Sequence, residues 1–244
     1  MGKLRYRTDK TPLRLIQDRP QCQQCAAMEL CAIAWLDGEV TTAIDRITLD
    51  RGTFQAGEAI YRMEDCFRSL FIVQSGLVKV EKILEDGTNQ VTGFCFSGDL
   101  FGLKSIGHAH YGYDAIALET TKICEITYSG LEALCASYPS LQQLLITLLG
   151  NKLQQANELL FDGRQLCAEQ RLLRFIKGLC ERKLLWCGDD RSRLHLPMSK
   201  TDIASFLGVR PESVSRALTN LQKQGVIRNH HRCIQVDDLD IAEH

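Results

Sequence analysis

The feature that most constrains the fold is a long segment in the middle of the chain whose apolar residues have helical spacing. Residues 139–161 read PSLQQLLITLLGNKLQQANELLF, and their apolar positions recur every three or four residues rather than every second one. Pro139 precedes the first turn and Gly163 follows the last, and both residue types are typical of helix boundaries. The sequence therefore predicts one continuous helix over residues 139–162.

Two apolar stripes run along this predicted helix. One covers only the first two turns and consists of Leu141, Leu144, Leu145 and Leu148. The other follows alternating steps of three and four, as in the seam of a coiled coil, and consists of Ile146, Leu149, Leu153, Ala156 and Leu160. An apolar edge that continues beyond a core needs a partner in water, so we predict a dimerisation helix. A core helix within a single domain is the alternative.

Composition limits the class of protein. The chain has 244 residues, of which 45% are hydrophobic and 24% charged, as in soluble globular proteins of one or two domains. The basic N-terminus lacks the apolar core of a signal peptide, and no run approaches the length of a membrane span. We expect a cytoplasmic protein without a membrane partner. Eleven cysteines in a reducing compartment favour metal binding or redox sensing over disulfides.

Charge is distributed unevenly along the chain. Residues 1–164 carry 16 basic and 20 acidic residues, net −4, whereas residues 165–236 carry 13 and 6, net +7. The tail from Asp237 onward carries four acidic residues and no basic one. A compact basic segment is typical of a nucleic-acid-binding domain, although it can also be an ordinary solvated surface.

Three cysteines cluster near the N-terminus. Cys22, Cys25 and Cys31 have the spacing C-x2-C-x5-C, which brings three thiolates within reach of one metal centre. Such thiolates suit an iron–sulfur cluster or zinc, and either normally takes a fourth ligand. Spacing alone leaves that ligand open among Cys66, Cys95, Cys124 and Cys135. The alternative is a set of unrelated buried cysteines that act as small hydrophobic residues.

The segment from Asp50 to Ile126 has the pattern of a β domain. Short apolar runs such as SLFIVQSG, LVKVEKIL and KICEIT are separated by turn residues. LVKVEKIL alternates apolar and polar residues, and Asp86 and Gly87 then supply a favoured hairpin dipeptide before the return strand NQVTGFCF. A small barrel or double-sheet roll is the predicted architecture.

The basic segment has the pattern of a helix-turn-helix. CAEQRLLRFIKGLCERKL reads as an amphipathic helix, and in the following stretch Ala204 precedes Gly208 by four residues and Val214 by ten. Pro211 suits the first turn of the second helix, and VIRNHHRCIQV reads as a two-stranded wing with His230 and His231 at its tip.

The second helix of this motif carries polar residues that could read DNA. Glu212 and Arg216 lie four apart, so they share one face, and they could accept from cytosine and donate to guanine at one G·C pair. A surface ion pair worth about 0.3–0.5 kcal/mol is the alternative. The full set of candidate DNA contacts is Glu212, Ser213, Ser215 and Arg216, together with Ser199 and Thr201 at the start of the first helix.

Together these motifs resemble the Crp–Fnr superfamily of transcription regulators, and most closely its oxygen-sensing Fnr type. The matching stretches are CQQC with Cys31, VTGFCFSGDLFG, ALETTKICEI, and DIASFLG with ESVSR. The resemblance implies an α+β fold with an N-terminal double-stranded β-helix domain of the jelly-roll, cyclic-nucleotide-binding type, a long dimerisation helix and a C-terminal winged helix-turn-helix. The expected divisions are a cysteine segment at 1–36, the roll at 37–138, the helix at 139–162, the DNA-binding domain at 163–237 and an acidic tail at 238–244.

The resemblance also implies a cofactor. In the family a cysteine of the ALET-x3-C-E-I strand completes a [4Fe–4S] cluster with three N-terminal cysteines, so the implied ligands here are Cys22, Cys25, Cys31 and Cys124. Cys66 and Cys95 are expected to be core or surface residues. No role is assigned to Cys135, Cys167, Cys180, Cys187 and Cys233.

Two departures from the family pattern matter. Cyclic-nucleotide binders of the family use a glutamate and an arginine in the roll, but this chain has Leu103 after Phe101-Gly102, and Asp114 between Tyr113 and Ala115, so no cyclic nucleotide is expected. Fnr-type proteins commonly have an acidic residue on the dimer seam, where this chain has Ala156. Two acidic residues at the seam would repel each other across the dimer. Because Ala156 carries no charge, the cluster-free protein is expected to dimerise more readily.

The motifs and the resemblance together predict a homodimeric DNA-binding regulator. The resemblance implies that it senses oxygen, or a related oxidant such as nitric oxide, and binds an inverted repeat of the TTGAT type. RNA polymerase is the expected protein partner, and activation or repression depends on where the sites lie in promoters. The alternatives are the same DNA-binding protein with a structural zinc or a thiol redox input, and an iron–sulfur enzyme. The chain has no nucleophile–base pair, phosphate-cradling loop or paired carboxylate motif, so we do not expect an enzyme.

Overall fold

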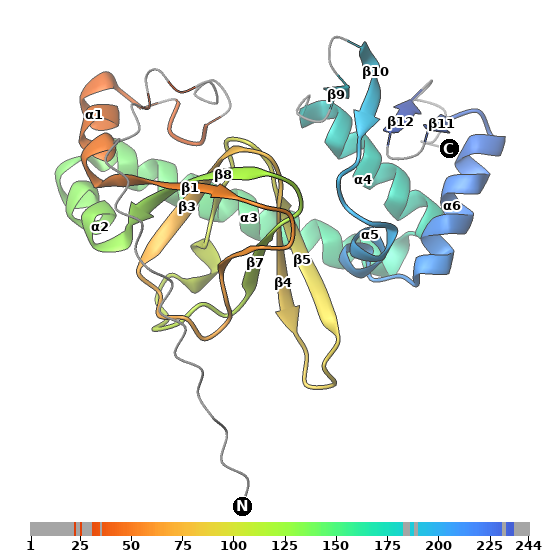
Figure 1. Ribbon diagram of the computed structural model, residues 1–244, viewed down its shortest axis with the longest axis horizontal. Helices are drawn as coiled ribbons and strands as arrows, with labels where there is room; N and C mark the ends of the chain where they lie inside the picture. Colours follow the sequence, from red (N-terminus) through yellow and green to blue (C-terminus); the bar gives the residue numbers. More distant parts are fainter. Residues whose placement is uncertain are drawn as a thin grey trace, which may run out of the picture.

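The computed structural model describes residues 22, 25, 31–34, 36–182, 186–187, 190–230 and 233–236. Figure 1 shows a β roll, a long helix that runs along it, and a second domain of helices with a small sheet. The N-terminal tail up to residue 21 and the acidic tail from residue 237 lie outside the described residues.

The roll consists of two antiparallel sheets of four strands each, in the orders β1-β8-β3-β6 and β2-β7-β4-β5. The strands of the first sheet are β1 Thr48–Phe54, β3 Ser69–Ser75, β6 Leu100–Phe101 and β8 Thr121–Thr127. Those of the second are β2 Ala59–Tyr61, β4 Val78–Ile83, β5 Asn89–Cys95 and β7 Asp114–Ala117. The predicted double-sheet roll is confirmed.

The hairpin expected at Asp86 and Gly87 joins β4 to β5. Ile83 pairs with Asn89 across it, and Gly87 has a φ of +79°, a conformation that glycine adopts without steric cost. A short 3-10 helix, η3 Leu103–Ser105, follows β6.

The first sheet has a different hydrophobic layer on each face, because side chains alternate along a strand. Between the two sheets lies an apolar core that includes Ile123 of β8 and is rich in aromatic rings. On the other face Cys124 and Ile126 of the same strand pack with helix α1, Gly38–Ile47, and helix α2, Tyr128–Ser137. We call this outer layer the cysteine layer; Cys22 and Cys31 also belong to it. Helix α1 was not predicted from the sequence.

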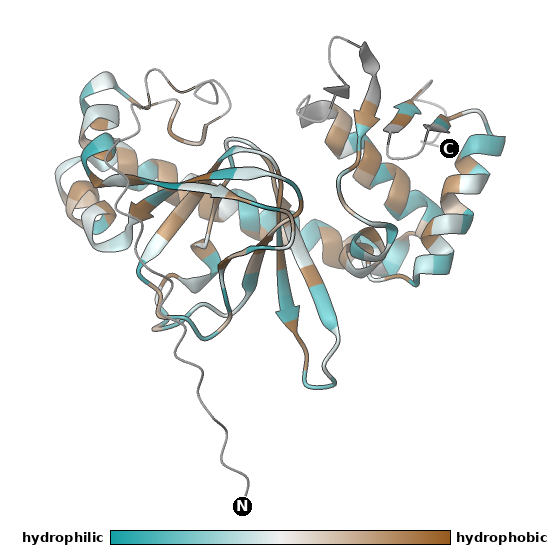
Figure 2. Cartoon of the chain, viewed as in Figure 1, coloured by the Kyte–Doolittle hydropathy of each residue, from teal (hydrophilic) through white to brown (hydrophobic). Residues whose placement is uncertain are grey.

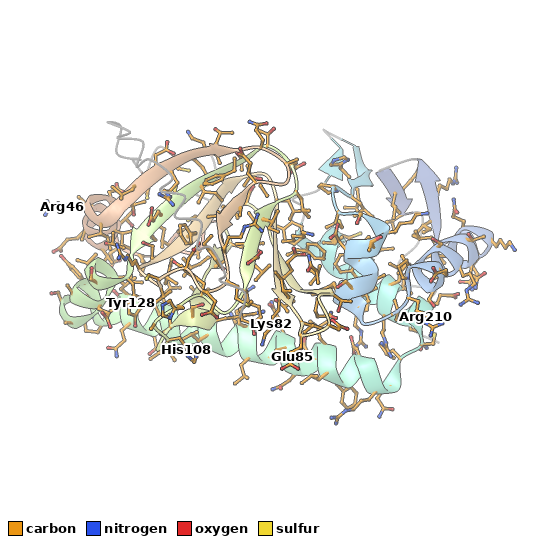
Figure 3. All side chains as sticks on the ribbon, turned by 60° about the horizontal axis from the view of Figure 1, so that its bottom comes forward. Arg46, Lys82, Glu85, His108, Tyr128 and Arg210 are labelled. Atoms are coloured by element: carbon orange, nitrogen blue, oxygen red, sulfur yellow. The ribbon has the colours of Figure 1, made fainter. Side chains whose placement is uncertain are left out.

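The predicted long helix is α3, Pro139–Gln165. Its first turns are anchored in the cysteine layer: Leu141 is buried, and Leu144, Leu145 and Leu148 are partly buried against it. Beyond them the helix leaves the core and continues along the molecule to the second domain (Figure 3). As predicted, the first apolar stripe is buried or partly buried against the roll, and the second is exposed in the single chain.

The second domain has helices α4 Ala168–Arg182, α5 Lys200–Leu207 and α6 Pro211–Lys223, and a sheet of order β11-β12-β10-β9. Its strands are β9 Trp186–Cys187, β10 Asp190–His195, β11 Ile227–His230 and β12 Cys233–Val236. Hydrophobic residues of α4, α5 and α6 meet in one core, and these helices carry both hydrophobic and hydrophilic residues in Figure 2.

The expected helix-turn-helix is confirmed in detail. Ala204 and Val214 are buried at the crossing of α5 and α6, and Gly208 ends α5 in the left-handed conformation with φ +65°. Pro211 occupies the first turn of α6. The predicted two-stranded wing is confirmed as β11 and β12, but it is part of a sheet of four strands. The other two strands, β9 and β10, were not predicted from the sequence. His230 ends β11, and His231 lies outside the described residues.

Candidate DNA-reading helix and cysteine site

Helix α6 is held by its apolar face, which leaves its polar face outward. Val214, Ala217, Leu218 and Leu221 are buried against α4 and α5. Glu169 of α4 accepts hydrogen bonds from Asn220 Nδ2 and Gln224 Nε2, both 2.9 Å long, and so fixes the C-terminal half of α6. A helix anchored at both its face and its end can present side chains at defined positions.

The predicted base-reading residues lie on the outward face of α6. Glu212 and Arg216 are exposed, while Ser213 and Ser215 are half-buried. In the part of the chain that the structure describes, no ion pair joins Glu212 to Arg216. Both side chains are therefore available for a ligand, and the alternative interpretation as an intrahelical ion pair is not favoured.

The other two candidate contacts lie at the start of α5. Ser199 is the N-cap: its Oγ accepts from the Asp202 backbone N–H at 3.0 Å and donates to Asp202 Oδ2 at 2.6 Å. Thr201 is exposed in the first turn. A helix N-terminus with its free N–H groups suits a phosphate, so these residues fit contacts to the DNA backbone rather than to bases.

The four candidate cysteines converge on the cysteine layer. Cys124 is buried in the middle of β8, opposite Asp50 of β1 and Ile72 of β3. Cys22 is also buried, and its backbone N–H donates to Asp45 Oδ1 of α1 at 3.1 Å. Its thiol lies in the same apolar cluster as Cys124.

Cys25 and Cys31 complete the group. The Cys25 backbone N–H donates to the carbonyl of Cys22 at 3.1 Å, and its sulfur accepts a contact from Gln74 Nε2 of β3 at 3.4 Å. Cys31 is half-buried at the edge of the cysteine layer. Asp45 and Gln74 were not expected as neighbours of the cysteines, because no local sequence signal links positions that meet only in the folded roll.

The thiols influence one another electrostatically. Burial, together with smaller contributions from the nearby Cys25 thiol, the Asp50 carboxylate and the Cys31 thiol, raises the pKa of Cys124 to about 12. Burial also raises the pKa of Cys22, with added contributions from Asp45, Cys31 and Cys124. Without a metal these thiols stay protonated, whereas a bound cation would reverse the balance because coordinated thiols deprotonate.

The geometry differs from that of a compact site for one ion. Among the described residues, no three Cys, His, Asp or Glu side chains are close enough to hold a single metal ion. A mononuclear zinc site requires its ligands about 2.3 Å from one centre. Each thiolate of a [4Fe–4S] cluster binds a different iron, so its four ligands lie farther apart. The donor set, with the thiols of Cys22, Cys31 and Cys124 in the apolar layer and that of Cys25 close to Cys124, fits the chemistry of such a cluster.

The remaining cysteines have other surroundings. Cys95 is buried in the aromatic core between the sheets, and Cys66 and Cys167 are exposed. Cys135 of α2 borders the cysteine layer, but burial and the neighbouring Glu132 are what raise its pKa, rather than the other cysteines. Cys180 is buried in the second domain.

The interior of the roll is filled by aromatic rings. Tyr61 stacks on Tyr111 with ring centroids 4.0 Å apart, and Phe71 and Phe101 stack beside them at 5.5 Å from each other. Asp114, at the position of the family's phosphate-binding arginine, is buried and accepts from Arg62 Nη1 at 2.9 Å. It also accepts from the Met63 backbone N–H at 2.6 Å.

The chain matches two family models and a group of curated proteins. Residues 51–138 match a cyclic nucleotide-binding domain, and residues 170–241 match a Crp-like helix-turn-helix domain. The fumarate and nitrate reduction regulatory protein of Escherichia coli K12 is 31% identical over 219 residues, which are 90% of this chain and 87% of that protein. The corresponding Klebsiella oxytoca protein is 31% identical over 220 residues, 90% of this chain and 88% of that protein.

The chain belongs to the Crp–Fnr superfamily, in its Fnr-type branch. It is a DNA-binding transcription regulator and not an enzyme. FixK2 from Bradyrhizobium japonicum has a similar structure, with a TM-score of 0.73 and 26% identity over 80% of this chain and 95% of that one. The c-di-GMP-responsive regulator CLP of Xanthomonas campestris shares the fold, with a TM-score of 0.67 and 18% identity over 82% of this chain and 99% of that one.

Within the described residues, no helix combines the length and apolarity that a membrane crossing requires. Ile146, Leu149, Leu153 and Leu160 of α3 are large apolar residues that are exposed in the single chain.

Proposed function

We propose that this Fnr-type regulator binds a [4Fe–4S] cluster through Cys22, Cys25, Cys31 and Cys124, and that it senses oxygen or a related oxidant with it. The observation that carries the proposal is that Cys124, from the middle of β8, lies in one apolar layer with Cys22 and Cys31, while Cys25 and Cys31 are close enough to raise its pKa. A bound [4Fe–4S] cluster supplies iron and sulfide that oxidants attack. Structural zinc on the same four thiols is the alternative.

The cysteine layer offers a physical route from the cluster to the dimer. Leu141, Leu144 and Leu145 of α3 pack in the same layer as Cys22 and Cys124, so a change in cysteine ligation bears directly on the first turns of α3. We propose that ligation sets how α3 meets its mate, with a loose dimer or monomer and a tight dimer as the two states.

The seam of α3 supports a homodimer. Ile146 is 54% exposed, Leu149 40%, Leu153 65% and Leu160 64%, which is unusual for large apolar side chains on one helix edge. Ala156 is exposed in the same row. A second copy of α3 is the partner that fits, because the row has the spacing of a two-stranded coiled coil.

The proposed dimer defines the proposed DNA site. Two copies of α6 related by a two-fold axis require an inverted repeat with half-sites about one helical turn apart. By resemblance we propose TTGAT and its complement ATCAA, with Glu212 and Arg216 at the G·C pair and Ser215 at a neighbouring thymine. RNA polymerase is the proposed protein partner, and the cytoplasm, where the DNA lies, is the proposed location.

Several observations support a regulator without a cyclic nucleotide. The phosphate of a cyclic nucleotide would meet the Asp114 carboxylate, which already accepts hydrogen bonds from Arg62 and from the Met63 backbone. Four aromatic rings fill the interior of the roll. We propose that the chain divides into domains at 1–36, 37–138, 139–162, 163–237 and 238–244. In this proposal the roll responds to the state of the cluster and binds no nucleotide.

The proposal is tested by anaerobic purification followed by a visible absorption spectrum and counts of iron, sulfide and zinc. The wild type should contain about four iron and four sulfide per protomer, as in a [4Fe–4S] cluster. Cys124→Ser should remove the visible absorption, whereas the control variants Cys95→Ser and Cys66→Ser should keep it. Stoichiometric zinc without sulfide, or loss of absorption in Cys95→Ser but not in Cys124→Ser, would contradict the assignment.

A further inference from the structure

The DNA-binding domain is attached to the roll at a second place besides the chain connection between α3 and α4. Helix α5 lies against the β4–β5 hairpin of the roll, and the two share both polar and apolar contacts. This contact lies outside the cysteine layer and outside the reading face of α6. The residues that make it have no part in the function described so far.

The first polar contact is an ion-pair network around Lys79 of β4. Its Nζ lies 3.0 Å from Asp202 Oδ1 in α5 and 2.8 Å from Glu81 Oε2 in its own strand. Burial would lower the pKa of Lys79, but the hydrogen bonds to Glu81 and Asp202 outweigh it and raise that pKa. Lys79 therefore stays charged at neutral pH, and its ion pair with Asp202 joins the two domains.

The second polar contact completes the open edge of a sheet. Strand β5 ends the order β2-β7-β4-β5, so one side of it has no neighbouring strand. Ser205 Oγ of α5 donates to the Asn89 carbonyl at 3.1 Å and accepts from the Val91 backbone N–H at 2.9 Å. Gln90 Nε2 donates to the Ser205 carbonyl oxygen. One serine thus satisfies two outward-facing backbone groups of β5.

An apolar cluster lies behind these polar contacts. Phe94 of β5 packs against Phe206 of α5 at 5.3 Å and against Phe175 of α4 at 5.9 Å between ring centroids. Leu77 and Val91 of the roll are buried in the same core as α4 and α5. The two domains therefore share a continuous core rather than a wet gap.

The chain connection itself is clamped separately. Arg171 of α4 donates to the carbonyls of Gly163 at 2.6 Å, Leu166 at 2.9 Å and Leu207 at 3.2 Å, and Arg174 pairs with Asp162. The contact between α5 and β5 is a second attachment at a distance from this connection, and the two attachments together define one orientation of α6.

This orientation leaves the DNA-reading surface open. Glu212 and Arg216 remain exposed while α5 is docked, and so do Ser199 and Thr201. Of the α5 residues used for docking, Asp202 and Ser205 are partly buried at the polar contacts, and Phe206 packs against the shared core. The docked arrangement is thus compatible with DNA binding, and it fixes where α6 stands relative to the roll.

We propose that Lys79 and Ser205 are positioning residues for DNA binding, which hold α6 so that the two copies in the dimer match one spacing of half-sites. The inference rests on the proposed dimer. A change of one base pair in spacing moves a half-site by about 3.4 Å along the DNA and about 35° around it. A domain fixed at two points discriminates against such a change, whereas a domain fixed at one point can follow it.

The test uses the anaerobic full-length protein and duplexes in which the centres of TTGAT and ATCAA lie one helical turn apart, which we call the natural spacing, or one base pair more or less than that. In Lys79→Met, Ser205→Ala and the double variant, affinity for the natural spacing should fall about tenfold. The ratio of the affinity for the natural spacing to the affinity for an altered spacing should fall at least about threefold. Lys79→Arg should keep most of that ratio, because it can retain the ion pair. The matched control is Lys82→Met, since Lys82 is an exposed lysine of the same hairpin (Figure 3).

The outcomes separate this inference from the proposed dimer. Variants that sediment as dimers and keep the wild-type ratio, or that lose affinity equally at every spacing, would overturn the positioning role. The same loss of ratio in Lys82→Met would overturn it too. A wild type that remains a monomer on the inverted repeat would instead contradict the proposed function and remove the basis of the inference.

Discussion

Leu153→Ala is the substitution that most directly tests how much the seam of α3 contributes to dimer stability. Leu153 is 65% exposed in the single chain and lies at the centre of the seam, between Leu149 and Ala156. The substitution removes about three carbon groups, worth about 2.4 kcal/mol when fully buried at about 0.8 kcal/mol per group. If a second α3 covers the exposed part, about 1.6 kcal/mol is lost per protomer and about 3 kcal/mol per dimer.

This loss corresponds to an increase of about 100-fold in the dimer dissociation constant, since about 1.4 kcal/mol is a factor of ten. Sedimentation equilibrium of the anaerobic protein over a range of concentrations measures that constant. Leu49→Ala is the matched control, because Leu49 is 48% exposed on β1 of the roll, outside α3. A change below about threefold in Leu153→Ala, or an equal change in Leu49→Ala, would refute the reasoning that the seam is the dimer interface.

Three further substitutions test separate parts of the account. Ala156→Asp should make the cluster-free protein more monomeric in sedimentation at micromolar concentration, because two carboxylates would face each other in an apolar seam; equal sedimentation of both proteins would count against the seam as the switch. Arg216→Ala should cost about 1–3 kcal/mol on the specific duplex and relax preference at the G·C pair; an equal loss on random DNA, measured by fluorescence anisotropy, would mean that Arg216 contacts only phosphate. Ser199→Ala should lower stability by about 1 kcal/mol in chemical denaturation, because it removes the cap of α5; Thr201→Ala, at the neighbouring exposed position, should leave stability nearly unchanged.

The parts of the fold that the sequence predicts are those with a strong local period. The stripe of α3 changes from a broad apolar face at Leu141–Leu148 to a narrow seam, and burial changes at the same place. The helix-turn-helix was predictable because a small residue, a glycine and a β-branched residue occupy positions that the crossing of two helices requires. The hairpin at Asp86 was predictable for a similar local reason.

Elements without such a period were missed. Helix α1, GEVTTAIDRI, contains three β-branched residues in succession, and its stability comes from burial of Val40 and Ile44 in the cysteine layer. Strand β10, DRSRLH, is nearly all polar and is specified by its pairing with β9 and β12. In both cases the tertiary surroundings decide the structure rather than the local propensity.

The candidate sites divide in the same way. Spacing brought three cysteines together but left the fourth ligand open, and the choice of Cys124 came from the family resemblance. The surroundings of Cys124 depend on the register of β8 between β1 and β3, which no local pattern reveals. The pairing of Lys79 with Asp202 joins residues 123 positions apart, and only the folded chain brings them within 3.0 Å.

The central claim is that the state of a cluster on the four cysteines controls DNA binding. The most direct measurement follows visible absorbance and the anisotropy of a labelled TTGAT–ATCAA duplex in one anaerobic sample while oxygen is added in steps. The account predicts that bound DNA falls in proportion to the visible absorbance of the cluster. Absorbance that disappears while DNA stays bound, or DNA that is released while absorbance persists, would contradict it.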